Sequence, residues 1–314
     1  METVLITGGT GMIGKALTQA LIERGFNVIV LTRHISEKQK AKIEKLSYAI
    51  WDLEKRTIDK DALAKGDYII HLAGASVAEK RWTEERKKEI VSSRVDSGKL
   101  IVESLKTLPN KIKTIISATA IGWYGPDKNG RKTFTEVDPS SNDFLGQTSK
   151  QWEAAIEPVS FLGKRLVKLR IGIVLSNEGG AYVEFKKPLN FRFATILGNG
   201  KQIVSWIHID DLVRAILFAM GNEKMEGVYN AVAPHPVSNK ELVLEIARKE
   251  RGRSYFPVHV PIFALKIRLG EMSIEVLKSA TVSSEKIQQA GFIFQYSNLE
   301  SAISQLASQK NLPG

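Results

Sequence analysis

The 314-residue sequence contains no cysteine, which excludes disulfides, thiol nucleophiles and cysteine metal sites, and we predict no metal site. It also lacks an uninterrupted apolar run of about 18 residues, so a membrane span is not expected. The first residues enter an apolar segment without the features of a signal peptide. The simplest expectation is a cytoplasmic protein.

Positive charge exceeds negative charge by 11 at neutral pH. Such an excess is a feature of some proteins that bind nucleic acid or acidic lipid. The basic clusters are scattered along the chain, however, and no helix-turn-helix, zinc-finger or RNA-binding motif accompanies them. We therefore expect solvated basic faces and no nucleic-acid partner, with part of the charge serving an anionic cofactor or substrate.

A glycine-rich segment lies near the start of the chain. Residues 4–7 are typical of a buried strand, residues 8–14 are Gly-Gly-Thr-Gly-Met-Ile-Gly, and residues 15–24 have one apolar helical face. Strand, glycine turn and helix in this order form the context of a dinucleotide-binding fingerprint. The glycines admit a pyrophosphate close to the backbone, and the helix N-terminus attracts it. A glycine turn without a ligand is the alternative. The predicted cofactor contacts are Gly8, Thr10, Gly11, Met12 and Ile13.

The ends of the next two strands extend this prediction. A NAD site usually has an acidic residue about 20 residues after the fingerprint, whereas an arginine there accommodates the 2′-phosphate of NADP. The expected strand Asn27–Thr32 is followed by Arg33, so NADP(H) is favoured over NAD(H) unless Arg33 only caps an exposed strand. Asp52 and Leu53 follow the third strand and are candidates for the adenine end, although a turn explains Asp52 equally well.

Strands and helical segments alternate through the first half, which predicts an α/β fold with a Rossmann-type doubly wound parallel sheet. Leu72, Ala73 and Gly74 end the fourth strand, and small residues at this edge allow a ligand to lie against the backbone. Further strands are expected at 112–116 and 166–175. A loop with hydroxyls and aromatics should follow the first of them.

The glycine-rich and aromatic segment 179–200 interrupts the alternation of strands and helices. We expect it to leave the sheet and to build a smaller lobe on the substrate side. The predicted division assigns 1–178 and 205–233 to an NADP-binding domain, and 179–204 and 234–314 to the C-terminal substrate lobe.

Two sets of segments resemble a known family. Four segments resemble the extended short-chain dehydrogenase/reductase superfamily: Thr7–Gly14, His71–Ala75, Tyr124-Gly125 and Trp206–Asp211. Further segments resemble its atypical epimerase-like branch: Arg81–Thr83, Ser93-Arg94, Ala120–Gly125, Phe144-Leu145 with Trp152-Glu153, Gly270–Met272 and Gly291–Phe294. Members of this branch are described as NAD-dependent epimerase/dehydratases or as SulA-like cell-division inhibitors.

The resemblance implies a catalytic Ser or Thr after the fifth strand and a Tyr-x-x-x-Lys on the next helix, with the Tyr as general acid/base. Thr119 matches the first position, unless its hydroxyl only bonds to backbone, and Lys150 is the candidate lysine. Gly146 stands where the tyrosine would be. A second register puts Leu145 at the Tyr position and Ser149 at the Lys position, so neither provides a phenol.

Other residues are candidates for the missing chemistry. Tyr124 is close in sequence to Thr119, although the resemblance places it in the substrate pocket wall. His208 can titrate near neutral pH, with a structural histidine as the alternative. Arg94 and Arg81 are candidates for holding an anionic group through fork-like hydrogen bonds, with surface salt bridges as the alternative. The resemblance also makes Ile171 a cofactor contact.

The sequence therefore predicts an NADP(H)-binding oxidoreductase or epimerase acting on a hydroxyl or carbonyl group of a small, sugar-like or other molecule. A non-catalytic NADP(H)-binding sensor or scaffold is the alternative, because the tyrosine is missing. Helices 84–105 and 144–156 resemble those that build dimers in the superfamily, so a homodimer is one of the expected oligomeric states.

Overall fold

An eight-stranded sheet forms the centre of the computed structural model, which describes residues 1–40, 43–127 and 133–309. The strands are parallel except for the last, which runs antiparallel to its neighbour. In sheet order they are β12 (Gly227–Ala231), β7 (Arg165–Ile171), β6 (Thr114–Ala120), β5 (Tyr68–His71), β1 (Thr3–Thr7), β2 (Asn27–Thr32), β3 (Leu46–Asp52) and β4 (Thr57–Ile58). The predicted Rossmann-type sheet is confirmed. The strand order reverses between β1 and β5, where such sheets bind ligands.

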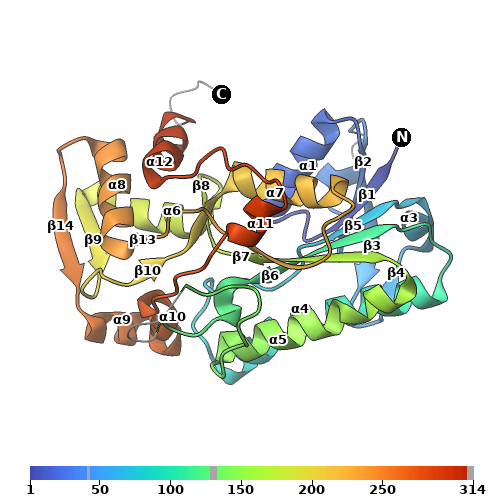
Figure 1. Cartoon of the computed structure of the whole chain (residues 1–314), viewed down its shortest axis with the longest axis horizontal. Coiled ribbons are helices and arrows are strands. Elements are labelled where there is room, and N and C mark those ends of the chain that lie inside the picture. Colours follow the sequence, from blue (N-terminus) through green and yellow to red (C-terminus); the bar gives the residue numbers. More distant parts are fainter. Residues whose placement is uncertain (41–42, 128–132, 310–314) are drawn as a thin grey trace.

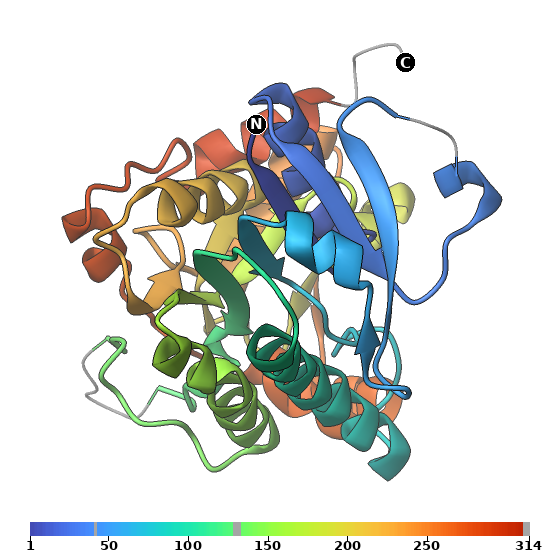
Figure 2. The ribbon, with the colours of Figure 1, turned by 90° about the vertical axis from the view of Figure 1, so that its right-hand side faces the viewer.

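Helices cover both faces of this sheet (Figures 1 and 2). On one face lie α1 (Met12–Glu23) and α7 (Ile209–Gly221), and on the other lie α3 (Lys60–Lys65), α4 (Glu84–Thr107) and α5 (Phe144–Ile156). Each strand contributes apolar side chains to both cores, because successive side chains point to opposite faces of the sheet. In β1, for example, Val4 and Ile6 join the α1–α7 core, whereas Leu5 joins the other.

A smaller lobe is built from three two-stranded sheets and several helices in the described part of the chain. The strand pairs are β8 (Ile173–Ser176) with β11 (Trp206–His208), β9 (Phe193–Leu197) with β14 (Phe256–Val260), and β10 (Ile203–Val204) with β13 (Val237–Ser238). The helices are α6 (Gly180–Lys186), α8 (Asn239–Arg251), α9 (Ile262–Leu269), α10 (Ser273–Leu277) and α12 (Leu299–Ser308). Among the helices described, none is long and apolar enough to cross a membrane.

Short helices join these elements. They are α2 (Glu37–Lys40), α11 (Glu285–Gln289) and the 3-10 helices η1 (Ile121–Trp123), η2 (Glu157–Leu162), η3 (Lys187–Phe191) and η4 (Gly270–Met272). Helix α11 lies beside the main sheet in Figure 1. Ile287 and Phe292 are buried in the α1–α7 core, so this part of the predicted substrate lobe packs on the nucleotide-binding half.

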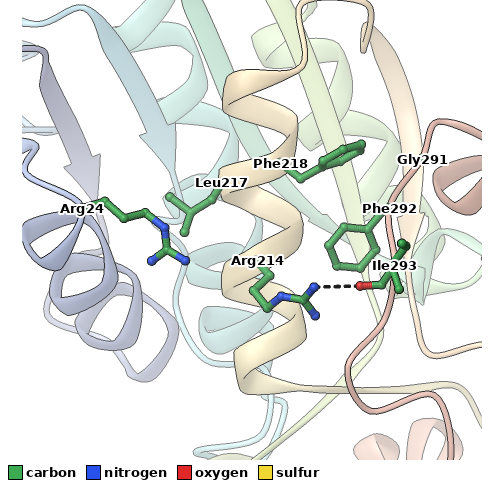
Figure 3. Close-up of a pocket in the computed structure, with 7 residues that line it drawn as sticks. All are labelled: Arg24, Arg214, Leu217, Phe218, Gly291, Phe292 and Ile293. Carbon is green, nitrogen blue, oxygen red and sulfur yellow. Dashed lines mark hydrogen bonds between the residues drawn. The ribbon is translucent and has the colours of Figure 1, made fainter.

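The C-terminal segment is tied to α7 by a buried carboxylate. Asp211 is fully buried and accepts hydrogen bonds from the backbone N–H groups of Gln295 and Tyr296, each at 2.8 Å. Its other donor is Arg214, at 2.7 Å. Figure 3 shows Arg214 also donating to the carbonyl of Ile293, beside a surface depression that reaches the C-terminal end of α1 at Arg24. This depression therefore lies away from the glycine turn.

Two predicted strands differ from the observed ones. The expected strand 112–116 begins at Thr114 and continues to Ala120, because it pairs with β7 along its whole length. Residues 117–120 are therefore strand rather than loop. The expected strand 166–175 breaks at Gly172, where a Cβ would lie 2.7 Å from the Ser205 carbonyl oxygen. This break separates β7 from β8.

A buried ion pair joins α5 to β7. Arg170 donates from Nε and Nη2 to the two carboxylate oxygens of Glu153, at 2.8 and 3.0 Å. The guanidinium carbon lies 3.7 Å from the centroid of the Trp123 ring, and Nη1 donates to the Tyr124 hydroxyl at 3.0 Å. The side chains of Arg170 and Glu153 are only 2% and 7% exposed. Removing one partner leaves a buried charge without compensation.

We expect Glu153→Gln to lower the free energy of unfolding by about 3 kcal/mol, the cost of breaking a buried pair. Chemical denaturation measures this loss. The matched control is Glu184→Gln, which removes an exposed pair with Lys187 and should cost at most about 1 kcal/mol. Equal losses in the two variants would contradict the structural role of the buried pair.

Candidate functional site

The turn between β1 and α1 is held by close backbone contacts that only glycine permits. Gly8 has a φ of +70°, and a Cβ on it would lie 2.8 Å from the backbone carbonyl of Leu72 at the end of β5. A Cβ on Gly14 would lie 2.3 Å from the Gly8 carbonyl oxygen. The turn is therefore pressed against the carboxyl edge of the sheet.

The N-terminus of α1 is open to an anion. Gly11 is the N-cap residue, and no side chain of the described residues caps the helix there. Thr10 and Gly11 are exposed, and Met12 and Ile13 are half-buried in the first turn. Free N–H groups and the helix dipole favour a phosphate at this position. The residues present therefore fit the pyrophosphate of a dinucleotide.

The other predicted cofactor residues follow neighbouring strands along the same edge. Arg33 is exposed directly after β2. Asp52 ends β3, and its carboxylate accepts hydrogen bonds from the backbone N–H groups of Glu54 and Lys55, at 2.9 and 3.0 Å. These bonds lower the pKa of Asp52. The turn interpretation of Asp52 is thus realised, and Leu53 beside it is half-buried.

A chain of buried hydrogen bonds supports the loop after β5. Thr7 Oγ1 accepts from the backbone N–H groups of Leu72 and Ala73, at 3.2 and 3.3 Å, and its own hydroxyl then donates to His71 Nδ1 at 2.7 Å. His71 Nε2 accordingly donates to Ser97 Oγ at 3.2 Å, which donates to the Arg94 carbonyl at 2.9 Å. Burial lowers the pKa of His71 to about 3. The ring is therefore a neutral link between β1, β5 and α4.

Arg94 lies immediately behind the same loop. Its Nη1 donates to the carbonyls of Ala75 and Ile90, both at 2.9 Å, and its guanidinium carbon is 4.9 Å from the Trp152 ring centroid. A Cβ on Gly74 would lie 3.1 Å from that carbon. Burial lowers the pKa of Arg94 to about 10, which leaves it charged at neutral pH. Arg94 thus places a cation beside the predicted cofactor loop.

A cavity of about 400 Å³ lies where the main sheet meets the smaller lobe. The sheet side contributes Ala120, Ile171 and Arg94, and the lobe side contributes Val204, Leu242 and Val276. The glycine turn is adjacent, because a Cβ on Gly179 would lie 3.6 Å from the Met12 sulfur and Ala181 lines the cavity. The geometry thus joins an anion-binding turn to a mainly apolar chamber.

Sequence profiles and relatives agree with this arrangement. A profile of the NAD dependent epimerase/dehydratase family matches residues 4–144 and 189–231, and a domain of unknown function, DUF1731, matches 260–306. An epimerase family protein of Staphylococcus aureus is 38% identical over 310 residues, which cover 98% of this chain and 100% of the relative. This chain belongs to the NAD dependent epimerase/dehydratase family. The resemblance to the atypical extended short-chain branch is confirmed.

Solved structures support the same family fold. The crystal structure of human epimerase family protein SDR39U1 with NADPH matches with a TM-score of 0.85 at 27% identity, covering 99% of this chain and 100% of that one. A nucleoside-diphosphate sugar epimerase from Corynebacterium glutamicum matches with a TM-score of 0.75 at 30% identity, covering 98% of this chain and 58% of that one. The epimerase-family fold thus spans nearly the whole chain.

In this epimerase-family chain the predicted catalytic residues do not meet in the cavity. Thr119 is buried in β6, and its hydroxyl donates to Glu153 at 3.3 Å. Tyr124 is fully buried, donates to Asn230 at 2.8 Å and accepts from Arg170; burial raises its pKa to about 12. Lys150 lies on the exposed face of α5. None of the three is among the described residues that line this chamber, and their catalytic roles stay predictions.

One face of α5 lines the cavity. Leu145, Ser149 and Trp152 follow one another at helical spacing and line the cavity. In the register that pairs Leu145 with Ser149, both residues lie on this face, whereas Lys150 of the other register is exposed. Neither register places a phenol there.

Sequence reasoning missed a charged pair in the cavity wall. Glu275 and Lys278 both line the cavity, and Lys278 Nζ lies 2.7 Å from Glu275 and 3.2 Å from Asp143. Burial raises the pKa of Glu275 despite the neighbouring ammonium. The available signal was spacing, because Met272, Glu275 and Val276 share one face of the helical turns after the family motif Gly270–Met272.

Two other candidates lie outside the described cavity lining. His208 is buried as the N-cap of α7, where Nδ1 accepts from the backbone N–H of Asp210 and Nε2 faces Gln305 at 3.0 Å. Burial lowers its pKa, so the structural interpretation holds. Arg81 is exposed beside Gly270, outside the cavity wall.

Acidification should destabilise this epimerase-family fold through His71. Because its folded pKa is about 3 and its ordinary value is 6.5, its contribution is complete above pH 6.5 and is lost as the pH falls toward 3. The free energy of unfolding should fall with decreasing pH more steeply in wild type than in His71→Asn, and the difference between the two slopes should approach about 1.4 kcal/mol per pH unit. Denaturation from pH 7 to 4.5 measures it, with exposed His34→Asn as the control. Parallel curves for wild type and His71→Asn would contradict a neutral buried ring.

Proposed function

We propose that this chain binds NADP(H) and catalyses a reduction, oxidation or epimerisation at a hydroxyl- or carbonyl-bearing carbon of a small molecule. The observation that carries the proposal is the glycine turn beside a partly open chamber at the carboxyl edge of the sheet. When bound, the nicotinamide supplies or accepts a hydride. The human relative contains NADPH, which supports the choice of cofactor.

The residues assigned to cofactor binding follow the sheet edge. The backbone at Gly8, Thr10, Gly11, Met12 and Ile13 would hold the pyrophosphate. Arg33 would contact the 2′-phosphate, and Asp52 and Leu53 the adenosine end. Leu72, Ala73, Gly74, Arg94 and Ile171 would border the nicotinamide half.

Proton transfer must use groups other than the usual tyrosine. Among the described residues that line the cavity, the ionisable side chains are Arg94, Glu275 and Lys278. Glu275 is the best placed to exchange a proton, because it lines the cavity, burial raises its pKa above the ordinary value, and Lys278 stabilises its anion. Lys278 also orients this carboxylate by linking it to Asp143 at the N-terminus of α5.

A non-catalytic NADP(H) sensor is the second candidate function. Leu145 on the cavity side of α5 favours it, because the usual proton donor of the superfamily is missing there. In that case the cofactor would stabilise the junction of sheet and lobe, and a partner would respond to the bound state. Turnover distinguishes the two candidates.

Arg33→Ala should weaken NADPH binding by roughly 10- to 100-fold and leave NADH binding nearly unchanged, since one charged hydrogen-bond donor to a phosphate is lost. Fluorescence titration with each cofactor measures the change. The matched control is Arg24→Ala, which removes the same charge at the opposite end of α1. An unchanged ratio of the two affinities would remove the role of Arg33. Failure of wild type to bind either cofactor would overturn the proposed function.

Glu275→Gln should lower NADPH-dependent carbonyl reduction by about 100-fold while NADPH affinity stays constant. The assay follows absorbance at 340 nm across a panel of aldehydes and ketones, with pH profiles for wild type. Exposed Glu285→Gln is the matched control. Wild-type turnover that survives in Glu275→Gln excludes this proton donor, and a panel without any turnover favours the sensor.

A further inference from the structure

The cavity wall is chemically unlike a site for a nucleotide sugar. Its lining is dominated by aliphatic and aromatic side chains, such as Trp82, Ile121, Phe185, Ile203 and Leu242. A diphosphate or a sugar ring needs several converging hydrogen-bond groups, because burying such groups without partners is costly. Apolar lining favours an apolar occupant.

Three polar side chains of the wall are already engaged in hydrogen bonds within the fold. Ser205 donates to the Ala280 carbonyl at 2.8 Å, Thr148 donates to the Phe144 carbonyl at 2.7 Å, and Asn239 accepts from the Leu197 N–H at 2.9 Å. These bonds satisfy the fold itself. Among the described side chains of the wall, the indole N–H of Trp152, buried without a hydrogen-bond partner, and the Ser149 hydroxyl are open to a ligand, which is few directed contacts for the several hydroxyls of a sugar.

The charge in the wall also disfavours a diphosphate. Lys278 is shared between the carboxylates of Glu275 and Asp143, so this corner carries two acidic groups around one ammonium. An anion placed there would meet the carboxylates at short range. Arg94 is the other cation, and it already bonds to two carbonyls beside the predicted cofactor loop.

Apolar side chains continue outside the chamber on the same lobe segment. Ile274 lies between the cavity residues Met272 and Val276 and is 58% exposed. Phe263 and Ile267 on the neighbouring α9 are 67% and 71% exposed. An apolar molecule approaching the lobe would therefore meet apolar surface close to the chamber.

We propose that the substrate is an apolar carbonyl compound or alcohol with an extended hydrocarbon body, rather than a nucleotide sugar. This inference rests on the proposed function for its reaction, and it goes further by naming the substrate class. The hydrocarbon body fills the chamber between α5 and the smaller lobe, with the reacting carbon toward Ile171 and Gly172. Affinity then comes mainly from buried apolar area.

The test measures binding to the NADPH-saturated protein by quenching of tryptophan fluorescence, since Trp82 and Trp152 line the cavity. The probes are 2-heptanone, 2-nonanone, 2-undecanone and UDP-glucose. Affinity should rise about fourfold for each added methylene of the ketones, and UDP-glucose should produce no saturable signal. NADPH affinity is measured separately in the same preparation.

Val204→Trp fills the chamber from β10 and should reduce 2-undecanone affinity at least tenfold while NADPH affinity stays within twofold. The matched control is Val137→Trp, because Val137 is 93% exposed. Thermal melts of both variants confirm that they are folded. If Val204→Trp does not fold, Val276→Phe fills the same chamber from α10.

The possible results separate the two proposals. Saturable UDP-glucose binding, a flat response to ketone length, or ketone binding that a folded chamber-filling variant does not weaken would each overturn the apolar-substrate inference while NADPH binding stands. Absence of NADPH binding would overturn the proposed function instead. The inference is supported if ketone affinity rises with chain length and if a folded chamber-filling variant weakens that affinity.

Discussion

The close approach of the glycine turn to the end of β5 is the constraint on which the site depends. Backbone atoms of Gly8 and Leu72 lie so near that a Cβ between them would be 2.8 Å from a carbonyl. Beneath this contact, the neutral ring of His71 links the end of β1 to α4. Turn, strand ends and helix are therefore fixed together, which sets the direction of the first N–H groups of α1.

Two hydrophobic cores stabilise the main sheet, one on each of its faces. Strand alternation packs both faces of the main sheet, which makes the nucleotide-binding half rigid. The smaller lobe contributes the far wall of the chamber and is tied back by Asp211 and by the packing of Ile287 and Phe292. A single C-terminal segment thus both closes the chamber and completes the main core, which couples substrate-side geometry to the stability of the sheet.

Family membership determines the fold of the chain but does not determine which residues carry out the reaction. Thr119 and Tyr124 are hydrogen-bonded to the buried pair of Glu153 and Arg170, and their catalytic roles stay predictions. Leu145 lines the chamber from α5. Among the described residues of the wall, the ionisable side chains are Arg94, Glu275 and Lys278.

The sequence by itself determined the order of strands and helices, the glycine turn and the family, because these depend on local periodicity and on short-range backbone constraints. It predicted α5 at its observed bounds and Arg33 at the end of β2. Only the tertiary structure decided which side chains face the chamber. Tyr124 accepts a hydrogen bond from the Arg170 guanidinium and Thr119 donates one to Glu153, whereas Glu275 and Asp143, far apart in the sequence, meet around Lys278 because the lobe folds back onto α5. Such contacts depend on long-range packing, which no local pattern encodes.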